Sequence, residues 1–386
     1  MHSTTLKNTT SRKKYLKFYY NFDWVLFLST LPLVAAGLIA MYSFSEQSYF
    51  FNKQVVWVVI SVIIFFALGL LDLRFLKRTD FLVSCFIFAC FSLVALLFLG
   101  ASIKGAQSWF NFGGIAIQPA DPVKILVILI LAKYFSRRHI EIANIRHILV
   151  SGFYAFIPFM LILLQPDFGS AMIIFFIWLG MASVSGISKK HLIFVFIIAI
   201  VSISILWFYG FTQNQKNRII SFIHPLTDIR GTGYNAYQST IAVGSGGILG
   251  KGVGYGTQSR LEFLPEYETD FIFAAFSEEW GFIGSVLLFI CFGVLLWRIL
   301  ANAMLGATNF EILYGVGLAV FFVSHIAVHI GMNIGILPVT GLPLPFVSYG
   351  GSHLLTEFAG LGILMSMRRY GRAAHKEVSS NEFVGV

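Results

Sequence analysis

Long, nearly uninterrupted apolar runs recur along the whole chain, separated by polar connections. Each run approaches the roughly 20 apolar residues that a helix needs to cross a bilayer. Outer-membrane barrel strands would instead show short segments in which apolar and polar residues alternate. We therefore predict an all-α integral membrane protein with ten transmembrane helices, over residues 23–43, 54–71, 81–100, 118–135, 148–164, 169–187, 191–211, 271–297, 311–335 and 350–367.

The connections between these runs differ in length and charge. Nineteen Lys and Arg residues fall on the side of the N-terminus and seven on the opposite side. Because Lys and Arg concentrate in cytoplasmic loops, we expect both termini in the cytoplasm. The one long connection, residues 212–270, is then extracytoplasmic. We expect residues 1–22 and 368–386 to be cytoplasmic tails and residues 23–367 to form one membrane domain.

The composition of the 386 residues agrees with this fold class. Hydrophobic residues make up 57% and charged residues 12%, whereas a soluble domain has about 25% charged residues. The 41 Phe residues also exclude an intrinsically disordered chain. We interpret the net charge of +9 as a topology signal and expect no nucleic-acid partner. All three cysteines fall in apolar runs, which argues against a disulfide framework or a zinc cluster.

Acidic residues approach the start of the eighth predicted helix. Asp270 is the last carboxylate before the apolar run 271–276. A carboxylate at the mouth of a membrane cavity is partly desolvated, which makes it a better general base. The alternative is that Asp270 caps the N-terminus of the helix, where Asp is common. The spacing alone favours the cap.

Charged residues also occur inside predicted helices. Asp121 and Lys124 lie three residues apart, which places them on one face of a helix. Ionisable residues at membrane depth usually face an interior cavity, although a structural ion pair is an equal alternative. Asp167, in a short turn between two runs, either caps the sixth helix or faces the interior. His325 and His329 have a spacing found in metal ligands, but interhelical hydrogen bonding is the favoured interpretation.

Two segments interrupt the helical pattern. Residues 231–256 contain nine glycines and do not match the phosphate-binding loop GxxxxGK[ST]. We expect a flexible segment, or one that lies at the membrane interface. Residues 338–352 are rich in proline and glycine, so they cannot form a plain helix. Irregular backbone near membrane depth is tolerated where it lines a cavity.

Several long motifs make the chain resemble the SEDS family of bacterial cell-wall proteins, and its RodA branch in particular. The resemblance extends over nearly the whole chain. The motifs are KGAQSW (104–109), QPADPVK (118–124), QPDFGSA (165–171), GTQSRLEFLPEYETDFIFA (256–274) and GILPVTGLPLPFVSYGGS (335–352).

The resemblance implies a function in cell-wall synthesis and cell shape. Members of this family are peptidoglycan glycosyltransferases that polymerise lipid II at the outer face of the bacterial cytoplasmic membrane. They work with a class B penicillin-binding protein, which cross-links the strands. The partners implied here are therefore lipid II, the undecaprenyl-pyrophosphate-linked glycan, a class B penicillin-binding protein and the membrane.

The resemblance also suggests site residues. Asp270 takes the position of the family's essential aspartate and is the predicted catalytic base. Cations are needed to stabilise the pyrophosphate that leaves, and a divalent cation (Mg²⁺ or Mn²⁺) is a candidate cofactor. The predicted substrate-binding residues are Trp109, Asp121, Lys124, Asp167, Arg218, Arg260, Ser348 and Tyr349.

Some positions depart from the family pattern. Ser108 stands where the family usually has Arg, Asp121 where it has Glu, and His325 and His329 where it has Gln and Asn. These departures affect which residues would bind the pyrophosphate. The main alternative function is transport of lipid II across the bilayer, since intramembrane charges and broken helices also suit a transporter. A third is a scaffold that only recruits a penicillin-binding protein.

Overall fold

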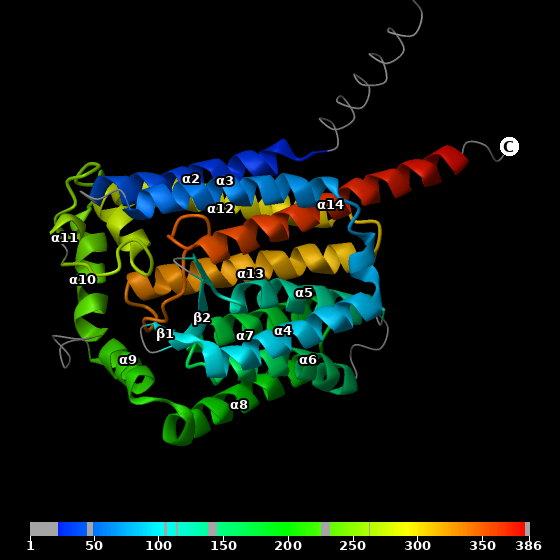
Figure 1. The fold of residues 1–386 in the computed structure, drawn as a ribbon, viewed down its shortest axis with the longest axis horizontal. Helices are drawn as coiled ribbons and strands as arrows, with labels where there is room; N and C mark the ends of the chain where they lie inside the picture. The colour runs from blue at the N-terminus through cyan, green and yellow to red at the C-terminus, as the bar shows by residue number, and fades with distance from the viewer. Residues whose placement is uncertain are drawn as a thin grey trace, which may run out of the picture.

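The computed structural model describes residues 22–44, 49–103, 106–112, 115–137, 145–224, 232–261 and 263–382. Long helices lie side by side in it, which confirms a mainly helical fold (Figure 1). Each predicted apolar run overlaps one of them. They are α2 (Trp24–Phe44), α3 (Tyr49–Leu70), α4 (Thr79–Leu99), α5 (Ala120–Ser136), α6 (Ile145–Leu163), α7 (Phe168–Val184), α8 (Lys189–Ile205), α12 (Ile272–Ala303), α13 (Asn309–Asn333) and α14 (Gly351–Glu382).

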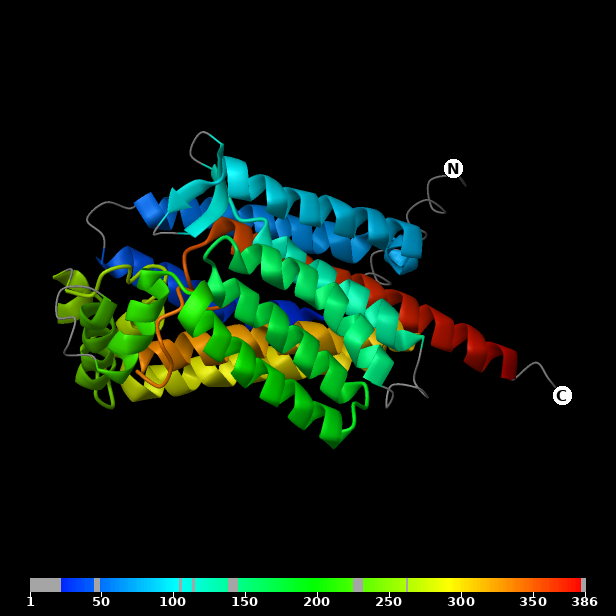
Figure 2. The same cartoon turned by 90° about the horizontal axis from the view of Figure 1, so that it is seen from below.

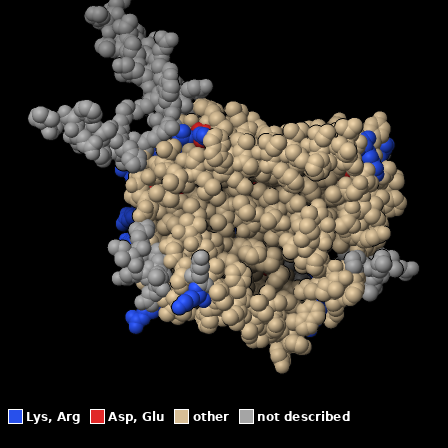
Figure 3. Space-filling view, turned by 180° about the vertical axis from the view of Figure 1, so that it is seen from behind, with Lys and Arg blue, Asp and Glu red and all other residues tan. Residues whose placement is uncertain are grey.

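Seven of the described helices are long and apolar enough to cross a membrane, judged by length and composition. They are α2, α3, α4, α6, α8 with its π-helical extension η2 (Leu206–Gly210), α12 and α13. Only 6% of the α8 window is buried inside the protein, so this helix exposes nearly all its apolar side chains. Figure 3 shows a broad surface between the two ends of the molecule that is almost without charged residues. An apolar surface of this extent is expected where lipid covers it.

A small antiparallel sheet corrects the all-α prediction. Its strands are β1 (Ala101–Ile103), β2 (Ala106–Phe112) and β3 (Ile115–Ile117), in the order β1-β2-β3. They occupy the connection between α4 and α5, where glycines at positions 100, 105, 113 and 114 disfavour another helix. The dipeptide Gly113-Gly114 between short apolar stretches is a hairpin signal that the prediction missed.

The long connection between α8 and α12 folds at one end of the bundle, and the C-terminal half of α14 extends from the other end (Figures 1 and 2). Its helices are α9 (Gln213–Ile223), α10 (Thr232–Ser245) and α11 (Thr257–Arg260). Because α10 packs against α12, the described part of residues 231–256 is not a free loop, and its position at the membrane interface stays a prediction. At the other end, residues 368–382 continue α14 as a helix.

Glycines allow this connection to pack closely against α12. The helix kinks at Gly281, where φ is 65°. A Cβ atom at Gly281 would stand 2.2 Å from the backbone nitrogen of Gly250, so only glycine fits. Next to the kink, the Phe282 N–H donates a hydrogen bond of 2.9 Å to the Gly247 carbonyl. Backbone-to-backbone contact thus joins the long connection to the helix that follows Asp270.

The helix α5 lies inside the bundle and organises the site. It packs against α4, α6, α7, α13 and α14. Apolar residues bury most of its surface, among them Ile128, Leu131 and Phe135. Its first turn, which carries the two charged residues predicted to share a face, points toward the end of the bundle where the long connection folds (Figure 1).

Candidate active site

A cavity of about 590 Å³ lies between the end of the bundle and the long connection. It is lined by parts of α3, β2, α5 and α9, by the turn before α7 and by the segments that precede α12 and α14. Residues far apart in the sequence therefore meet in it. Of the predicted site residues, the cavity is lined by Trp109, Asp121, Lys124, Asp167, Arg218, Asp270 and Tyr349.

Asp270 lies in this cavity and is not the N-cap residue of the following helix. The N-cap position of α12 is Phe271, which makes no side-chain capping bond. The Asn333 side chain at the end of α13 fixes the backbone here, because its Nδ2 donates to the Asp270 carbonyl (3.0 Å) and its Oδ1 accepts from the Ala274 N–H (3.1 Å). An added Cβ at Gly341 would stand 3.5 Å from Asp270 Oδ2. The carboxylate therefore faces the proline- and glycine-rich segment at close range.

Ser348 and Tyr349 contact the loop that carries Asp270. The Ser348 hydroxyl donates to the Thr269 carbonyl at 2.7 Å, and the Tyr349 N–H donates to the Glu268 carbonyl at 2.8 Å. Ser348 does not line the cavity, so the structure places it behind the site as a support. The Tyr349 ring does line the cavity. Burial raises the pKa of its phenol, which keeps the ring neutral.

Asp121 and Lys124 meet as the helical spacing predicts, inside a larger buried cluster. Lys124 Nζ lies 3.1 Å from Asp121 Oδ1. Asp121 also accepts a hydrogen bond of 3.1 Å from the Ser352 hydroxyl, and His353 Nδ1 lies 3.2 Å from Asp121 Oδ1. On its other side, His353 Nε2 lies 2.9 Å from Glu357 Oε1. Two carboxylates thus alternate with an ammonium and an imidazole, and each is almost fully buried.

Asp167 satisfies both interpretations that the sequence left open. Its Oδ1 accepts from the Ser170 N–H at 2.9 Å, which caps α7. Its Oδ2 accepts from Gln118 Nε2 at 2.9 Å, which ties the turn to the start of α5. The side chain also lines the cavity. Capping and cavity lining coexist because a carboxylate has two oxygens with separate acceptor directions.

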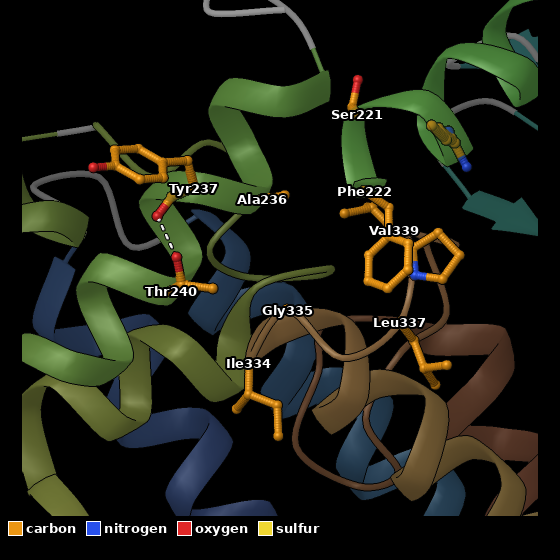
Figure 4. A pocket seen from close by; sticks show the side chains of 11 residues that line it. Ser221, Phe222, Ala236, Tyr237, Thr240, Ile334, Gly335, Leu337 and Val339 are labelled. Atoms are coloured by element: carbon orange, nitrogen blue, oxygen red, sulfur yellow. Dashed lines mark hydrogen bonds between the residues drawn. The ribbon is translucent and has the colours of Figure 1, made fainter. Parts of the chain in front are cut away.

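The two arginines predicted to bind substrate have different surroundings. Arg218 of α9 lines the cavity, and its Nη1 donates to the Thr340 carbonyl at 3.5 Å. It also lines a smaller adjoining pocket of about 150 Å³, formed by α9, α10 and the segment after α13 (Figure 4). Arg260 lies exposed on α11 and lines neither space. The structure therefore does not bring Arg260 to the site.

The cavity contains residues that the sequence analysis missed. His353 lines the cavity, and Glu357 lies behind it in contact with the His353 ring. Both are ionisable residues inside the last apolar run, and the expectation that such residues face an interior cavity would have identified them as candidates. Lys53 and Tyr49, at the start of α3, also line the cavity or its rim. A lysine at the end of an apolar run resembles an ordinary topology signal, so the sequence did not distinguish it.

The two histidines predicted to form hydrogen bonds between helices are both buried inside the bundle. His329 Nδ1 lies 2.7 Å from the Leu342 carbonyl, which fixes the proline-rich segment to α13. The His325 ring lies 4.7 Å from the His353 ring, between centroids. No group of three or more His, Cys, Asp or Glu residues suited to a metal ion occurs among the described residues.

Comparison with known proteins decides the family. The model of the FtsW, RodA and SpoVE cell cycle proteins matches residues 18–373. The chain belongs to this family, the SEDS proteins. With its several long apolar helices it is a multi-pass membrane protein.

Two of the following three relatives are named peptidoglycan glycosyltransferases. The peptidoglycan glycosyltransferase MrdB of Escherichia coli K12 is 38% identical over 286 residues, which cover 74% of this chain and 77% of that protein. Stage V sporulation protein E of Bacillus subtilis is 36% identical, with 91% and 98% of the two chains covered. The peptidoglycan glycosyltransferase RodA of Treponema pallidum is 30% identical, with 90% and 97% covered.

Solved structures share the fold of this SEDS protein. A chain of a peptidoglycan synthase complex, studied for the coordination of polymerization and crosslinking, aligns with a TM-score of 0.78 and 28% identity, covering 91% of this chain and 98% of that chain. The rod shape-determining protein RodA of Thermus thermophilus aligns with a TM-score of 0.68 and 26% identity, covering 90% and 97%.

Proposed function

We propose that this SEDS protein is a peptidoglycan glycosyltransferase that polymerises lipid II into glycan strands during cell elongation. Its enzyme class is supported by relatives of that name at 30–38% identity. The observation that carries the proposal is the single cavity in which the Asp270 carboxylate lies together with Lys124 and Arg218. A base and cations are what a transfer from a pyrophosphate-linked sugar requires.

The proposed reaction is a single displacement. The 4-hydroxyl of the acceptor sugar attacks the anomeric carbon of the donor, and its proton passes to Asp270. The new C–O bond forms as the bond between the anomeric carbon and the pyrophosphate oxygen breaks, with inversion at that carbon. The leaving pyrophosphate is already an anion, so it needs no acid to protonate it. Lys124 and Arg218 would stabilise the charge that develops on it.

Two of the three carboxylates that line the cavity, Asp121 and Asp167, already have partners within the protein. Both oxygens of Asp167 accept hydrogen bonds within the protein, and Asp121 is occupied by Lys124, Ser352 and His353. Mg²⁺ commonly takes one or two carboxylates and completes its shell with phosphate and water oxygens. We therefore propose that any Mg²⁺ or Mn²⁺ reaches this site bound to the pyrophosphate of the substrate.

We further propose that all ten long helices cross the bacterial cytoplasmic membrane, with both termini in the cytoplasm. The long connection and the cavity would then face outward, where lipid-linked precursor is polymerised. The excess of Lys and Arg on the opposite side supports this orientation. A class B penicillin-binding protein is the proposed partner, in line with the peptidoglycan synthase complex that the fold resembles.

Polymerisation of labelled lipid II by the purified chain, with and without a class B partner, tests this function. Asp270→Asn keeps the size of the side chain but cannot accept the proton, so we expect stable protein and a loss of about 10²–10⁴-fold in rate. Glu266→Gln is the matched control, because it removes a neighbouring carboxylate that does not line the cavity. Wild-type rates from Asp270→Asn would exclude the base. Transport of lipid II across liposomes without polymer would favour the flippase instead.

A further inference from the structure

The proposed reaction brings two pyrophosphate groups into one cavity. Both substrates are linked to their lipids through pyrophosphate, and only the donor loses it. The donor's pyrophosphate adjoins the reacting carbon, whereas the acceptor's lies at the far end of its disaccharide from the attacking hydroxyl. One cation cannot neutralise two anions that are held this far apart, because the interaction weakens with distance and solvent screening. The site therefore needs two separate cationic residues, one for each pyrophosphate.

The cavity offers two cations that no carboxylate in the described part of the chain neutralises. Its described lining residues include three Lys or Arg residues, namely Lys53, Lys124 and Arg218. Lys124 is paired with Asp121 and is 1% exposed. Lys53 and Arg218 form no ion pair with a described carboxylate. Lys53 Nζ instead lies 2.5 Å from the Tyr49 hydroxyl, and Arg218 contacts a carbonyl.

These two cations stand on different sides of the site. Arg218 comes from α9, and Lys53 comes from the N-terminal part of α3, a helix that lies across the bundle from α9 (Figures 1 and 2). Arg218 contacts Thr340, and the next residue, Gly341, faces the Asp270 carboxylate. Arg218 is therefore close to the proposed base, and we assign it to the pyrophosphate that would leave from the donor. Lys53 is then the cation that remains to bind the acceptor's pyrophosphate.

Aromatic rings surround Lys53 at the rim of the cavity. Its ammonium lies 4.3 Å from the centroid of the Tyr49 ring. The neighbouring Phe50 ring packs edge-on against Tyr349, with centroids 5.0 Å apart. All four residues line the cavity. Aromatic rings can pack against the apolar C–H face of a sugar, and an ammonium group can bind a phosphate.

We propose that Lys53, Tyr49, Phe50 and Tyr349 form an acceptor subsite, which binds the pyrophosphate and adjoining sugar of the incoming lipid-linked saccharide. This inference rests on the proposed function. Lysines and aromatic residues near helix ends also bind lipid headgroups at the membrane interface. The same phosphate chemistry would then serve anionic phospholipid, so the experiment separates the two sources.

Two lipid II analogues isolate one coupling event. An analogue whose terminal 4-hydroxyl is blocked acts only as donor. An analogue whose anomeric oxygen is replaced by a methylene group cannot lose its pyrophosphate and acts only as acceptor. Mixed together with the full chain and its partner in vesicles, they yield a single coupled product. Its initial rate gives a KM for each substrate.

Lys53→Gln should raise the KM for the acceptor analogue roughly tenfold, which corresponds to about 1.4 kcal/mol of lost binding. The KM for the donor analogue and kcat should stay within about twofold, and Lys53→Arg should recover most of the affinity. Arg218→Gln should instead raise the KM for the donor. Lys216→Gln is the matched control, since it removes a charge from the same end of the molecule but lines neither cavity nor pocket.

Three results would overturn the acceptor subsite. Unchanged KM values in Lys53→Gln would show that the residue binds neither substrate, and equal increases for both analogues would show that it does not select the acceptor. An effect present in anionic vesicles and absent in phosphatidylcholine vesicles would assign Lys53 to the lipid surface. Direct binding of the acceptor analogue gives a separate readout. If wild-type protein couples nothing, yet Lys53→Gln binds this analogue about tenfold more weakly, the subsite stands and the polymerase proposal fails.

Discussion

Asp23 and Asp121 are both buried carboxylates that are paired with cationic side chains, but only Asp121 faces a cavity. Asp23 caps α2 by accepting from the Val25 N–H at 3.1 Å. Its other oxygen accepts from Arg298 Nε at 3.0 Å and lies 2.8 Å from Arg368 Nη1. The cluster joins α2, α12 and α14, and none of these residues lines the described cavities.

The cluster around Asp121 uses similar chemistry but leaves one side open. Asp121, Lys124 and His353 all line the 590 Å³ cavity, although each side chain is nearly buried. Their charges are arranged within the protein before a ligand arrives, so a ligand meets fixed dipoles and needs little reorganisation. The difference teaches that a buried ion pair alone does not mark a site. Contact with a cavity distinguishes the two.

The largest effect is expected from Lys124→Met. It leaves Asp121 without its ammonium in a buried environment, which costs roughly 3–5 kcal/mol of folding free energy. It should also abolish polymerisation, because Lys124 is a proposed pyrophosphate ligand. Thermal unfolding in detergent and the lipid II assay measure the two effects. The double change Asp121→Asn with Lys124→Met should regain stability but not activity. Recovery of both would mean that the pair is only structural.

A smaller effect, confined to stability, is expected from Asp23→Asn. The variant loses charge-assisted hydrogen bonds to arginine, which contribute roughly 1.5–3 kcal/mol. The cost should stay below that of Lys124→Met, because the Asn side-chain oxygen can still accept hydrogen bonds from Arg298 and Arg368, and Arg298 is 21% exposed to water. Polymerisation per folded molecule should match wild type. A specific loss of activity at unchanged stability would contradict the contrast between the two clusters.

The smallest effect is expected from a change at Asp72. Its Oδ2 lies 2.7 Å from Arg74 Nη2, and both side chains are exposed to solvent. Arg74 lowers the pKa of the Asp72 carboxyl through its hydrogen bonds. A lowered folded-state pKa stabilises the protein above the ordinary carboxyl pKa, and this contribution disappears as the pH falls through the folded value. Solvent screens the pair, so the unfolding curve of Asp72→Asn should overlay wild type at pH 7. If the unfolding curves of the variant and wild type differ clearly at pH 7 and still differ in acid, another contact of Asp72 is involved.

Local sequence spacing predicted some features of the site and missed others. The three-residue spacing of Asp121 and Lys124 was enough to place them together, because neighbours on a helix depend only on helical geometry. The same reasoning favoured a capping role for Asp270, and the structure places Phe271 at the cap instead. Arg260 and Arg218 were equal candidates in the long loop, yet only Arg218 reaches the cavity. Which loop side chain faces inward depends on contacts with distant helices.

The sequence by itself determined the helical class, the approximate helix positions and the pairs set by helical spacing. Burial of apolar runs in lipid needs only their length and composition, and both can be read locally. The tertiary structure alone decided which faces meet around the cavity. These helices are apolar on all sides, and lipid is as apolar as the protein interior, so hydrophobicity does not identify the inward face. Packing at glycines such as Gly281 and buried polar contacts such as Asn333 with Asp270 made that choice.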